Sequence, residues 1–366
     1  MKDNPSPSTG NPLTYREAGV DLEAKAQAFQ RIKGLVQSTY SPEVLSELGT
    51  FGGLFALQGF REPVLVSSVD SVGTKLKIAF ALDRHDTVGY DIVAHCANDI
   101  LVQGARPLFF LDYIGIGRLR PEVVEAILRG LVRGCQEVGC ALIGGETAEL
   151  PDLYAPGEYD LVGTIVGAVE RERLITGAQI RPGDVLVGLP SVGLHTNGYT
   201  LARKILFERV GLSVRDEIPG LGISVGEELL KPHRSYVAPC LELMETVPVR
   251  GMAHITGGGL PENLARILPE GCRAVVDRST WTPPPIFGYL QRAGEVPESE
   301  MFRVFNMGIG MVIVLARSDL EAAVALLHER GEAPILIGEV VSGPRAVEIR
   351  SSKGEDRNQW GKYNER

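Results

Sequence analysis

The sequence predicts an α/β (α+β) protein of two domains. Its 366 residues correspond to about two domains at roughly 150 residues each. Apolar, strand-like runs alternate with helix-like segments in both halves, and the charged stretch at 171–183 ends in a Pro-Gly turn between them. We therefore place a boundary near residue 175. The expected parts are a disordered lead-in at 1–12, an N-terminal domain at 13–175, a C-terminal domain at 176–350 and a polar, disordered tail at 351–366.

Hydrophobic spacing predicts the elements of the first half in order. Asp21 is expected to cap the first helix. On the helix at 87–103, Asp91, His95 and Asp99 follow one another at i, i+4 and i+8, so they share one side. The elements expected in this half are helices at 21–37, 87–103 and 121–138, strands at 63–69, 107–116, 140–143 and 159–169, and an extended segment at 75–80.

The second half repeats the alternation of strand-like and helix-like patterns. Short apolar runs indicate strands, and longer amphipathic stretches indicate helices. The elements expected here are strands at 184–189, 311–315, 335–341 and 346–350, and helices at 199–209, 234–246 and 319–330.

Composition excludes several classes of protein. The net charge of −9 argues against a broad nucleic-acid-binding surface. No window approaches about 18 uninterrupted apolar residues, so we expect no membrane-spanning helix. The first residues lack the apolar core of a signal peptide, so we expect a cytoplasmic location. Five cysteines without a Cys-x-x-Cys pair indicate reduced, packed thiols.

Glycine is unusually frequent, at 43 of 366 residues, and clusters beside acidic, hydroxyl and histidine side chains. This pattern is typical of loops that approach a ligand closely. The phosphate-binding Walker sequence, the G-x-G-x-x-G fingerprint, the G-x-S-x-G elbow and zinc-ligand spacings are all absent. A P-loop ATPase, a Rossmann dehydrogenase and a serine hydrolase are therefore not expected.

Three segments of the first half carry acidic residues beside glycine or apolar residues. Asp70 ends a predicted strand and is followed by Gly73, Thr74 and Lys75, which suit a metal-bound phosphate. The other two are Asn98-Asp99 on a helix and Gly144-Gly145-Glu146 after a short strand. Asp70, Asp99 and Glu146 could share Mg²⁺ ions that neutralise a triphosphate. The alternative is three unrelated solvated acids.

Two glycine-rich loops of the second half contain histidine. Ser191 to Tyr199 opens a helix and includes His195, and Ala253 to Asn263 includes His254. Backbone N–H groups at a helix start, with hydroxyl and amide side chains beside them, suit an anion, and histidine can transfer a proton. The alternative for each loop is a helix cap with a hydrogen-bonded histidine.

Together these loops resemble the phosphoribosylformylglycinamidine cyclo-ligase family, the aminoimidazole ribonucleotide synthetases of purine biosynthesis. The resemblance covers about residues 13–350. The motifs that carry it are TYREAGVD (14–21), RIKG (31–34), GTFGGLFAL (49–57), DSVGTKLK (70–77), ND (98–99), PLFFLDY (107–113), GGETAELP (144–151), YDLVGTIVG (159–167), HTNGY (195–199), GMAHITGGGLPEN (251–263) and FNMGIGM (305–311).

The resemblance implies ATP-dependent cyclisation of formylglycinamidine ribonucleotide to 5-aminoimidazole ribonucleotide, with release of ADP and phosphate. ATP would phosphorylate the formyl amide oxygen. The implied cofactors are ATP and Mg²⁺, with K⁺ as a further candidate ion. The implied fold is the family's two-domain arrangement, in which a homodimer joins the N-terminal sheets into a barrel-like core and the C-terminal α/β domain has a mixed sheet. No nucleic-acid or membrane partner is implied.

The resemblance also implies roles for single residues. His254, His195 and Lys75 are the expected catalytic residues, and Asp70, Asp99 and Glu146 the expected metal ligands. Expected to bind ATP are Lys33, Gly52, Gly53, Asp70, Gly73, Thr74, Lys75, Asn98, Asp99, Gly144, Gly145 and Glu146. Expected to bind the ribonucleotide are Ser191, His195, Thr196, Asn197, Gly198, Thr256, Gly257, Gly258 and Gly259.

The sequence departs from the family pattern at Ser71, His95, Ala97 and His233, and none of these changes removes a carboxylate. Thiamine-monophosphate kinase, selenophosphate synthetase and a hydrogenase-maturation enzyme belong to the same superfamily, so another ATP enzyme of that group is the alternative. A non-catalytic nucleotide-binding protein is a third reading. Retention of three acids and two loop histidines favours an enzyme.

Overall fold

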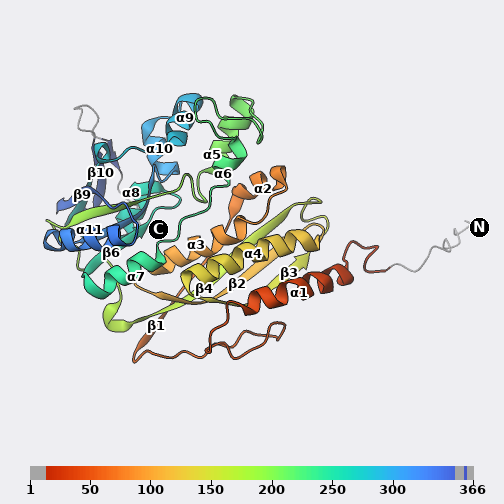
Figure 1. Ribbon diagram of the computed structural model, residues 1–366. Coiled ribbons are helices and arrows are strands. Elements are labelled where there is room, and N and C mark those ends of the chain that lie inside the picture. The colour runs from red at the N-terminus through yellow and green to blue at the C-terminus, as the bar shows by residue number, and fades with distance from the viewer. Residues whose placement is uncertain (1–13, 351–357, 361–366) are drawn as a thin grey trace, which may run out of the picture.

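The computed structural model describes residues 14–350 and 358–360, and it contains two β-sheets with helices packed on them (Figure 1). The predicted lead-in and most of the predicted tail lie outside the described residues. Residues 174–184, which include the predicted boundary, connect one sheet to the other. The two-domain α/β prediction agrees with this arrangement.

The first half forms an open sheet of four strands in the order β1-β4-β2-β3. β3 runs parallel to β2, and the other neighbours are antiparallel. Its elements are α1 (Leu22–Gln37), β1 (Pro63–Ser71), α2 (Leu76–Leu82), α3 (Val88–Leu101), β2 (Arg106–Ile116), α4 (Pro121–Val138), β3 (Ala141–Glu149) and β4 (Tyr159–Glu170).

Local sequence explains where two of these helices begin and end. The Asp21 carboxylate accepts hydrogen bonds from the backbone N–H groups of Glu23 and Ala24, both at 3.1 Å, as expected for the cap of α1. α4 begins at Pro121, whose fixed φ suits a first helical position, and ends at Gly139, which has a φ of 72°. α4 has the bounds that the sequence predicted, and α1 begins one residue later than the predicted 21–37 because Asp21 is its cap.

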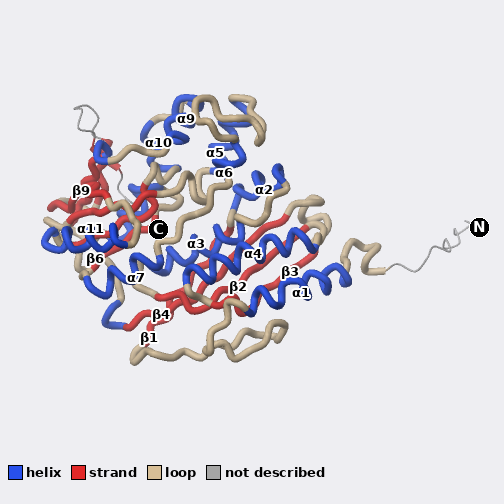
Figure 2. The backbone as a smooth tube through the Cα atoms, in the orientation of Figure 1, coloured by secondary structure: helices blue, strands red, loops and turns tan. Residues whose placement is uncertain are grey.

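α3 and α4 cover one face of this sheet (Figure 2). α3 lies against β1 and β4 on one side and α4 on the other, so nearly all of its side chains are buried. The two helices cross where Gly89 meets Gly130. A Cβ added to Gly89 would lie 2.1 Å from the Ile127 carbonyl oxygen, so only glycine permits this approach.

The second half contains a mixed sheet in the order β11-β10-β7-β9-β5-β8-β6. β10 is parallel to β7, and all seven residues of β8 are buried. Its elements are β5 (Val185–Pro190), α5 (Tyr199–Arg203), α6 (Val225–Leu229), α7 (Val237–Thr246), β6 (Val249–His254), α8 (Gly259–Ile267), β7 (Cys272–Asp277), α9 (Pro285–Gly294), α10 (Glu298–Val304), β8 (Ile309–Leu315), α11 (Leu320–Glu329), β9 (Ile335–Ser342), β10 (Ala346–Arg350) and β11 (Asn358–Trp360).

Several sequence predictions of secondary structure were wrong. The segment at 75–80 is helical, because a 3₁₀ turn at Gly73–Lys75 leads directly into α2; a short apolar run does not distinguish helix from strand. The strand predicted at 140–143 continues as β3 through Gly144 and Gly145. A Cβ on Gly145 would lie 2.3 Å from the Asp112 carboxylate, so this glycine permits close approach inside the strand. Part of the tail pairs with β10 as β11.

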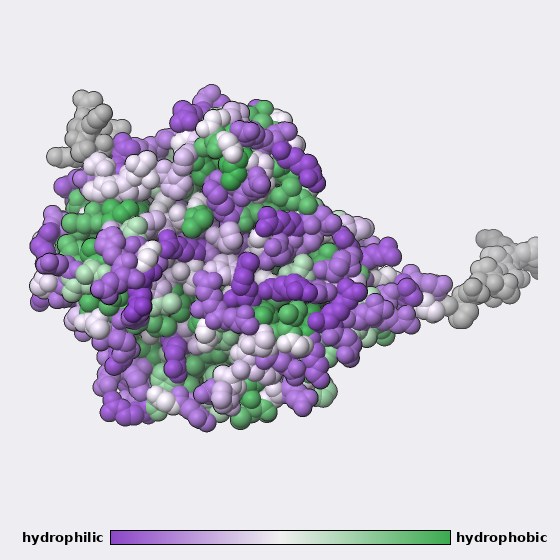
Figure 3. Space-filling model, in the orientation of Figure 1, coloured by the Kyte–Doolittle hydropathy of each residue, from purple (hydrophilic) through white to green (hydrophobic). Residues whose placement is uncertain are grey.

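Polar side chains dominate the face of the molecule in Figure 3, with smaller apolar patches between them. Within the part of the chain that the structure describes, no helix is both long and apolar enough to span a bilayer.

The close crossing of α3 and α4 generates a stability prediction. Gly89→Ala should lower the free energy of unfolding by about 1–3 kcal/mol, because the new methyl group meets the backbone of α4. Gly34→Ala is the matched control, since no atom lies within 4 Å of the added Cβ, and it should raise the free energy by about 0.5–1 kcal/mol. Urea denaturation of both variants measures this difference. Equal changes in the free energy of unfolding in the two variants would contradict the close contact between α3 and α4 at Gly89.

Candidate active site

The candidate site lies where α3 of the first half meets loops of the second half. Asn98 on α3 accepts a hydrogen bond from the Tyr236 backbone N–H at 2.9 Å and donates one to the Arg234 carbonyl oxygen at 2.9 Å. Asp91, two turns earlier, accepts one from the His233 backbone N–H at 2.7 Å. These side chains are fully buried, so their bonds fix the second half against α3.

Lys75 lies beneath this contact, away from the cavity described below. Its ammonium group is fully buried, lies 2.8 Å from the Asp91 carboxylate, and donates hydrogen bonds to the carbonyl oxygens of His195 and Lys231. Burial lowers the pKa of Lys75 and raises the pKa of Asp91. The negative charge of Asp91 partly offsets the first shift, and the positive charge of Lys75 partly offsets the second. The structure therefore shows Lys75 as a bridge between the halves, not as a phosphate ligand.

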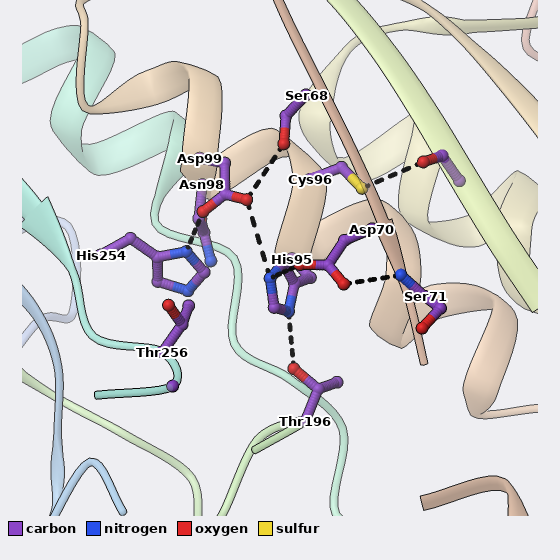
Figure 4. A network of polar contacts seen from close by, with 12 residues as sticks. Ser68, Asp70, Ser71, His95, Cys96, Asn98, Asp99, Thr196, His254 and Thr256 are labelled. Carbon is purple, nitrogen blue, oxygen red and sulfur yellow. Dashed lines mark hydrogen bonds and ion pairs between the residues drawn. The ribbon is translucent and has the colours of Figure 1, made fainter. Parts of the chain in front are cut away.

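Asp70 at the end of β1 and Asp99 on α3 lie together, each beside a histidine (Figure 4). Asp70 lies 2.9 Å from His95 Nε2, and Asp99 lies 2.8 Å from His254 Nδ1. Burial raises the pKa of each carboxyl, but the hydrogen bond and charge of its histidine outweigh burial, so both pKa values fall below the usual range. Both acids are therefore ionised at neutral pH.

The two histidines respond to burial differently. Burial lowers the pKa of His254, and its bond to Asp99 reverses this only in part. Burial also lowers the pKa of His95, but the hydrogen bond that His95 donates to Asp70 and the charge of Asp99 reverse the shift, so the pKa of His95 is raised.

His95, His195, His233 and His254 form one cluster. His233 Nε2 lies 3.0 Å from His254 Nε2, and the Thr196 hydroxyl joins His95 to His233 at 2.6 and 3.2 Å. His195 stacks on His233 with ring centroids 4.1 Å apart and accepts a hydrogen bond from the Val192 N–H. It is almost fully buried with a positive φ of 62°. His195 thus lies behind the cluster, whereas His254 reaches the cavity.

A cavity of about 640 Å³, here called the junction cavity, opens beside the paired acids. It is lined by Asp70, His95, Asp99 and His254 together with segments of both halves. Three further residues predicted to bind substrate line it, namely Asn197, Thr256 and Gly257. Arg266 is the sole arginine or lysine among its described lining residues, and sequence reasoning missed it because it lies at the far end of α8 from the glycine loop.

The remaining predicted substrate residues have other contacts. The buried Ser191 hydroxyl donates to Asn306 and to the Gly193 carbonyl oxygen. Gly198 precedes α5, and Gly258 and Gly259 open α8, all with positive φ. A Cβ on Gly259 would meet the Phe302 carbonyl oxygen at 1.8 Å. These glycines shape the loops, and they are not among the residues that line the junction cavity.

A second cavity of about 680 Å³, here called the glycine-lined cavity, lies among α1, α4 and the central parts of β2 and β3. It contains the predicted Gly52, Gly53, Gly144, Gly145 and Glu146. It also contains two residues that the sequence did not single out. Lys25 pairs with Glu146 at 3.1 Å, and burial raises the pKa of Asp112 to about 7.

The structure therefore brings Asp70 and Asp99 together but not Glu146. The register Asp70–Gly163–Asp112–Gly145 spans all four strands, so Asp70 and the Gly145–Glu146 segment lie roughly 14 Å apart. Of the other residues predicted to bind ATP, Lys33 lies on α1 but does not line the glycine-lined cavity. The Thr74 hydroxyl, beside Gly73, contacts Thr200 at 3.1 Å.

The fold and this site define an AIR synthase related protein. The family model for the N-terminal domain matches residues 58–169, the model for the C-terminal domain matches 181–350, and the chain belongs to this family. Within it, the chain is 54% identical over 331 residues to phosphoribosylformylglycinamidine cyclo-ligase of Trichlorobacter lovleyi, covering 90% of this chain and 95% of that protein. It is 52% identical to the same-named protein of Geotalea daltonii, covering 92% and 98%. These matches confirm the predicted resemblance.

Solved structures share the fold at low sequence identity. Thiamine-monophosphate kinase from Stenotrophomonas maltophilia matches with a TM-score of 0.64 and 18% identity, covering 88% of this chain and 95% of that one. The hydrogenase maturation protein HypE in complex with ATP matches with a TM-score of 0.66 and 18% identity, covering 92% and 95%. The predicted fold class is confirmed.

The position of Lys75 generates a second prediction. Lys75→Met should lower the free energy of unfolding by about 3–5 kcal/mol, because it leaves the Asp91 carboxylate buried without its cation. Adding Asp91→Leu should recover much of that loss. Lys77→Met, which removes an exposed pair with Glu158, is the control and should cost less than about 1 kcal/mol. Thermal and urea denaturation test this, and a stable Lys75→Met protein with weakened ATP binding would restore the phosphate role.

Proposed function

We propose that the protein catalyses the ATP-dependent closure of formylglycinamidine ribonucleotide to 5-aminoimidazole ribonucleotide, releasing ADP and phosphate. One observation carries this proposal: cyclo-ligases at about half identity match nearly the whole chain, including every segment that lines the junction cavity. The enzyme is thus a C–N bond-forming ligase of purine biosynthesis. Thiamine-monophosphate kinase shares the fold at only 18% identity, so it stays the weaker alternative.

The reaction needs an activated oxygen and a proton transfer. Phosphorylation of the formyl amide oxygen turns it into a leaving group, the amidine nitrogen attacks the same carbon, and phosphate departs. His254 reaches the cavity wall with its Nδ1 oriented by Asp99, so it suits proton transfer to or from the reacting amide. His195 is too enclosed for the same task, and its ring and carbonyl oxygen support the loop that holds Thr196 and Asn197.

Asp70 and Asp99 suit a divalent cation beside ATP. Both are ionised carboxylates with part of their surface open to the junction cavity, and oxygen ligands fit Mg²⁺. Such an ion would neutralise charge on the transferred phosphoryl group. K⁺ would need carbonyl or hydroxyl oxygens nearby, and the Thr256–Gly257 segment offers them.

Two features of the junction cavity suit the phosphate of the ribonucleotide. Arg266 places a guanidinium group in the lining, and the Thr256–Gly257 segment offers backbone N–H groups at the start of the nine-residue helix α8. The glycine-lined cavity suits the nucleotide, because Gly52, Gly53, Gly144 and Gly145 leave room for phosphates and Lys25 supplies a positive charge.

A homodimer would bring the separated acids Asp70 and Glu146 close together, each from a different copy. The outward face of β1 exposes Leu65 and Val69, at 61% and 64%, and the sheet ends at β1 on one side and β3 on the other. Joining two such sheets edge to edge would bury the exposed side chains and remove open strand edges. It would also bring the edge that carries Glu146 in one copy beside the edge that carries Asp70 in the other.

The activity is tested with purified protein and Mg-ATP, with and without formylglycinamidine ribonucleotide. ADP release should depend on this substrate and match the aminoimidazole product one to one, measured colorimetrically. Failure of an intact, ATP-binding protein would point to another phosphoryl acceptor, and thiamine monophosphate is then the next substrate to try.

Asp99→Asn should keep the fold and reduce turnover by several orders of magnitude, because the cation and His254 both lose a charged partner. Asp86→Asn, a change in an exposed pair with Arg84, is the control and should leave turnover unchanged. Turnover near that of the unaltered protein in Asp99→Asn would remove Asp99 from the site.

Leu65→Lys should convert the dimer to a monomer, because a charge on the outward face of β1 opposes burial against a second copy. Leu153→Lys alters a leucine of similar exposure, 70%, outside the sheet, and should leave the dimer intact. Light scattering coupled to size-exclusion chromatography gives both masses. A monomeric unaltered protein would contradict the dimer.

A further inference from the structure

The polar side of α3 continues along the junction cavity for one turn beyond Asp99. Gln103, in the turn that ends this helix, follows Asp99 at i+4, which places the two Cβ atoms about 6 Å apart on the same side. Both side chains line the cavity, with Val102 beside them. Gln103 is exposed, and its carboxamide has no hydrogen-bond partner among the described residues. The proposed function so far gives this side chain no task.

Two contacts place the end of α3 and the end of α8 at the same part of the cavity. The Ile175 N–H donates to the Gln103 carbonyl oxygen at 3.2 Å. Gly177, two residues later, has a φ of 80°, and a Cβ on it would lie 2.0 Å from the Ile267 carbonyl oxygen. Arg266 is the neighbour of Ile267 in α8. Gln103 and Arg266 therefore both lie at the part of the cavity that residues 175–177 line, here called the linker end.

α8 runs from the reacting groups to the linker end. It follows closely after His254, and Arg266 comes seven residues after Gly259, a rise of about 10 Å. Asn263, Arg266 and Ile267, at i, i+3 and i+4, all line the cavity, so one side of the helix extends along it. Among the described residues the Arg266 guanidinium has no ion-pair partner. The cavity thus has an unpaired cation about 10 Å from the groups that suit the reaction.

The substrate of the proposed reaction has matching dimensions. Five bonds separate its formyl carbon from C1′ of the ribose, about 6 Å when extended, and five more lead from C1′ to phosphorus, so the phosphate lies about 11 Å from the reacting carbon. With the formyl group at His254 and Asp99, the ribose lies beside Gln103 and the phosphate reaches Arg266. Of the two features of the cavity that suit a phosphate, this length selects Arg266.

The chemistry of a carboxamide matches the ribose better than the rest of the substrate. Glutamine offers an acceptor oxygen and a donor nitrogen side by side, and two neighbouring hydroxyl groups can donate to the first and accept from the second. The amidine of the substrate is rich in N–H donors, which suit a carboxylate more than a neutral amide. It also lies nearer to the formyl carbon, and therefore nearer to Asp99 than to Gln103.

We propose that Gln103 binds the 2′- and 3′-hydroxyl groups of the ribonucleotide while Arg266 binds its phosphate, so that the linker end of the junction cavity selects ribose. The proposal rests on the proposed function for the identity of the substrate, and it adds a specificity-determining residue to the same site. Gln103 does not reach the reacting atoms. Its loss therefore affects the affinity for the sugar and not the chemical step.

The test is a calorimetric titration of the full chain, without ATP, with formylglycinamidine ribonucleotide and with the analogue that lacks both ribose hydroxyls. The unaltered protein should bind the ribonucleotide about 10–100-fold more tightly, as expected for two hydrogen bonds between neutral groups. Gln103→Ala should bind both ligands equally. Arg266→Ala should weaken the binding of both by the same factor and keep the preference for the hydroxylated ligand. Gln136→Ala, which removes an exposed glutamine on α4 outside this cavity, is the control and should bind both ligands as the unaltered protein does.

Three results would overturn the proposal: equal binding of the two ligands by the unaltered protein, binding of neither, or an unchanged preference in Gln103→Ala. Ring closure is measured separately, as substrate-dependent ADP release. Ring closure by a protein without the hydroxyl preference would remove Gln103 from the site and leave the proposed function intact. A preference that disappears in Gln103→Ala, in a protein that does not close the ring, would do the reverse.

Discussion

The polar side of α3 is the constraint on which the site depends. Asp91, His95, Asn98 and Asp99 project from one helix, and together they contact three segments of the second half, namely 233–236, the loop at Thr196 and His254 at the end of β6. Buried polar groups of this kind cost free energy when they lose a partner. A shift of one half against the other would break several such bonds at once. The junction cavity therefore has one rigid wall, which is what a reaction between two substrates requires.

A buried ion pair below the cavity also holds the two halves in this arrangement. The Lys75–Asp91 pair is fully enclosed, and Lys75 also satisfies two carbonyl oxygens of the second half. A buried ion pair adds little net stability compared with apolar residues, but it fixes one arrangement because either charge alone is costly. Lys75 and Asp91 thus position the His195 loop and the His233 segment without touching a substrate.

Local signals in the sequence were sufficient for the helices that carry the site. Asp21 and Pro121 mark helix starts, and the repeat of Asp91, His95 and Asp99 places three titratable side chains on one side of α3. Local signals were not sufficient for residues whose role depends on contacts distant in sequence. Lys75 follows a glycine turn that suits phosphate, yet its partners lie more than a hundred residues away at His195 and Lys231.

The three residues of the repeat on α3 are also buried to different degrees. Asp91 and His95 are almost fully buried, and Asp99 keeps 29% of its side chain exposed at the cavity. Asp91 therefore holds the two halves together, His95 joins Thr196 to Asp70, and Asp99 lines the junction cavity. Because a helix is stiff over two turns, a change at Asp91 is transmitted to Asp99 as a change of position. Spacing predicted that these residues share a face, but only packing against the second half assigns each its task.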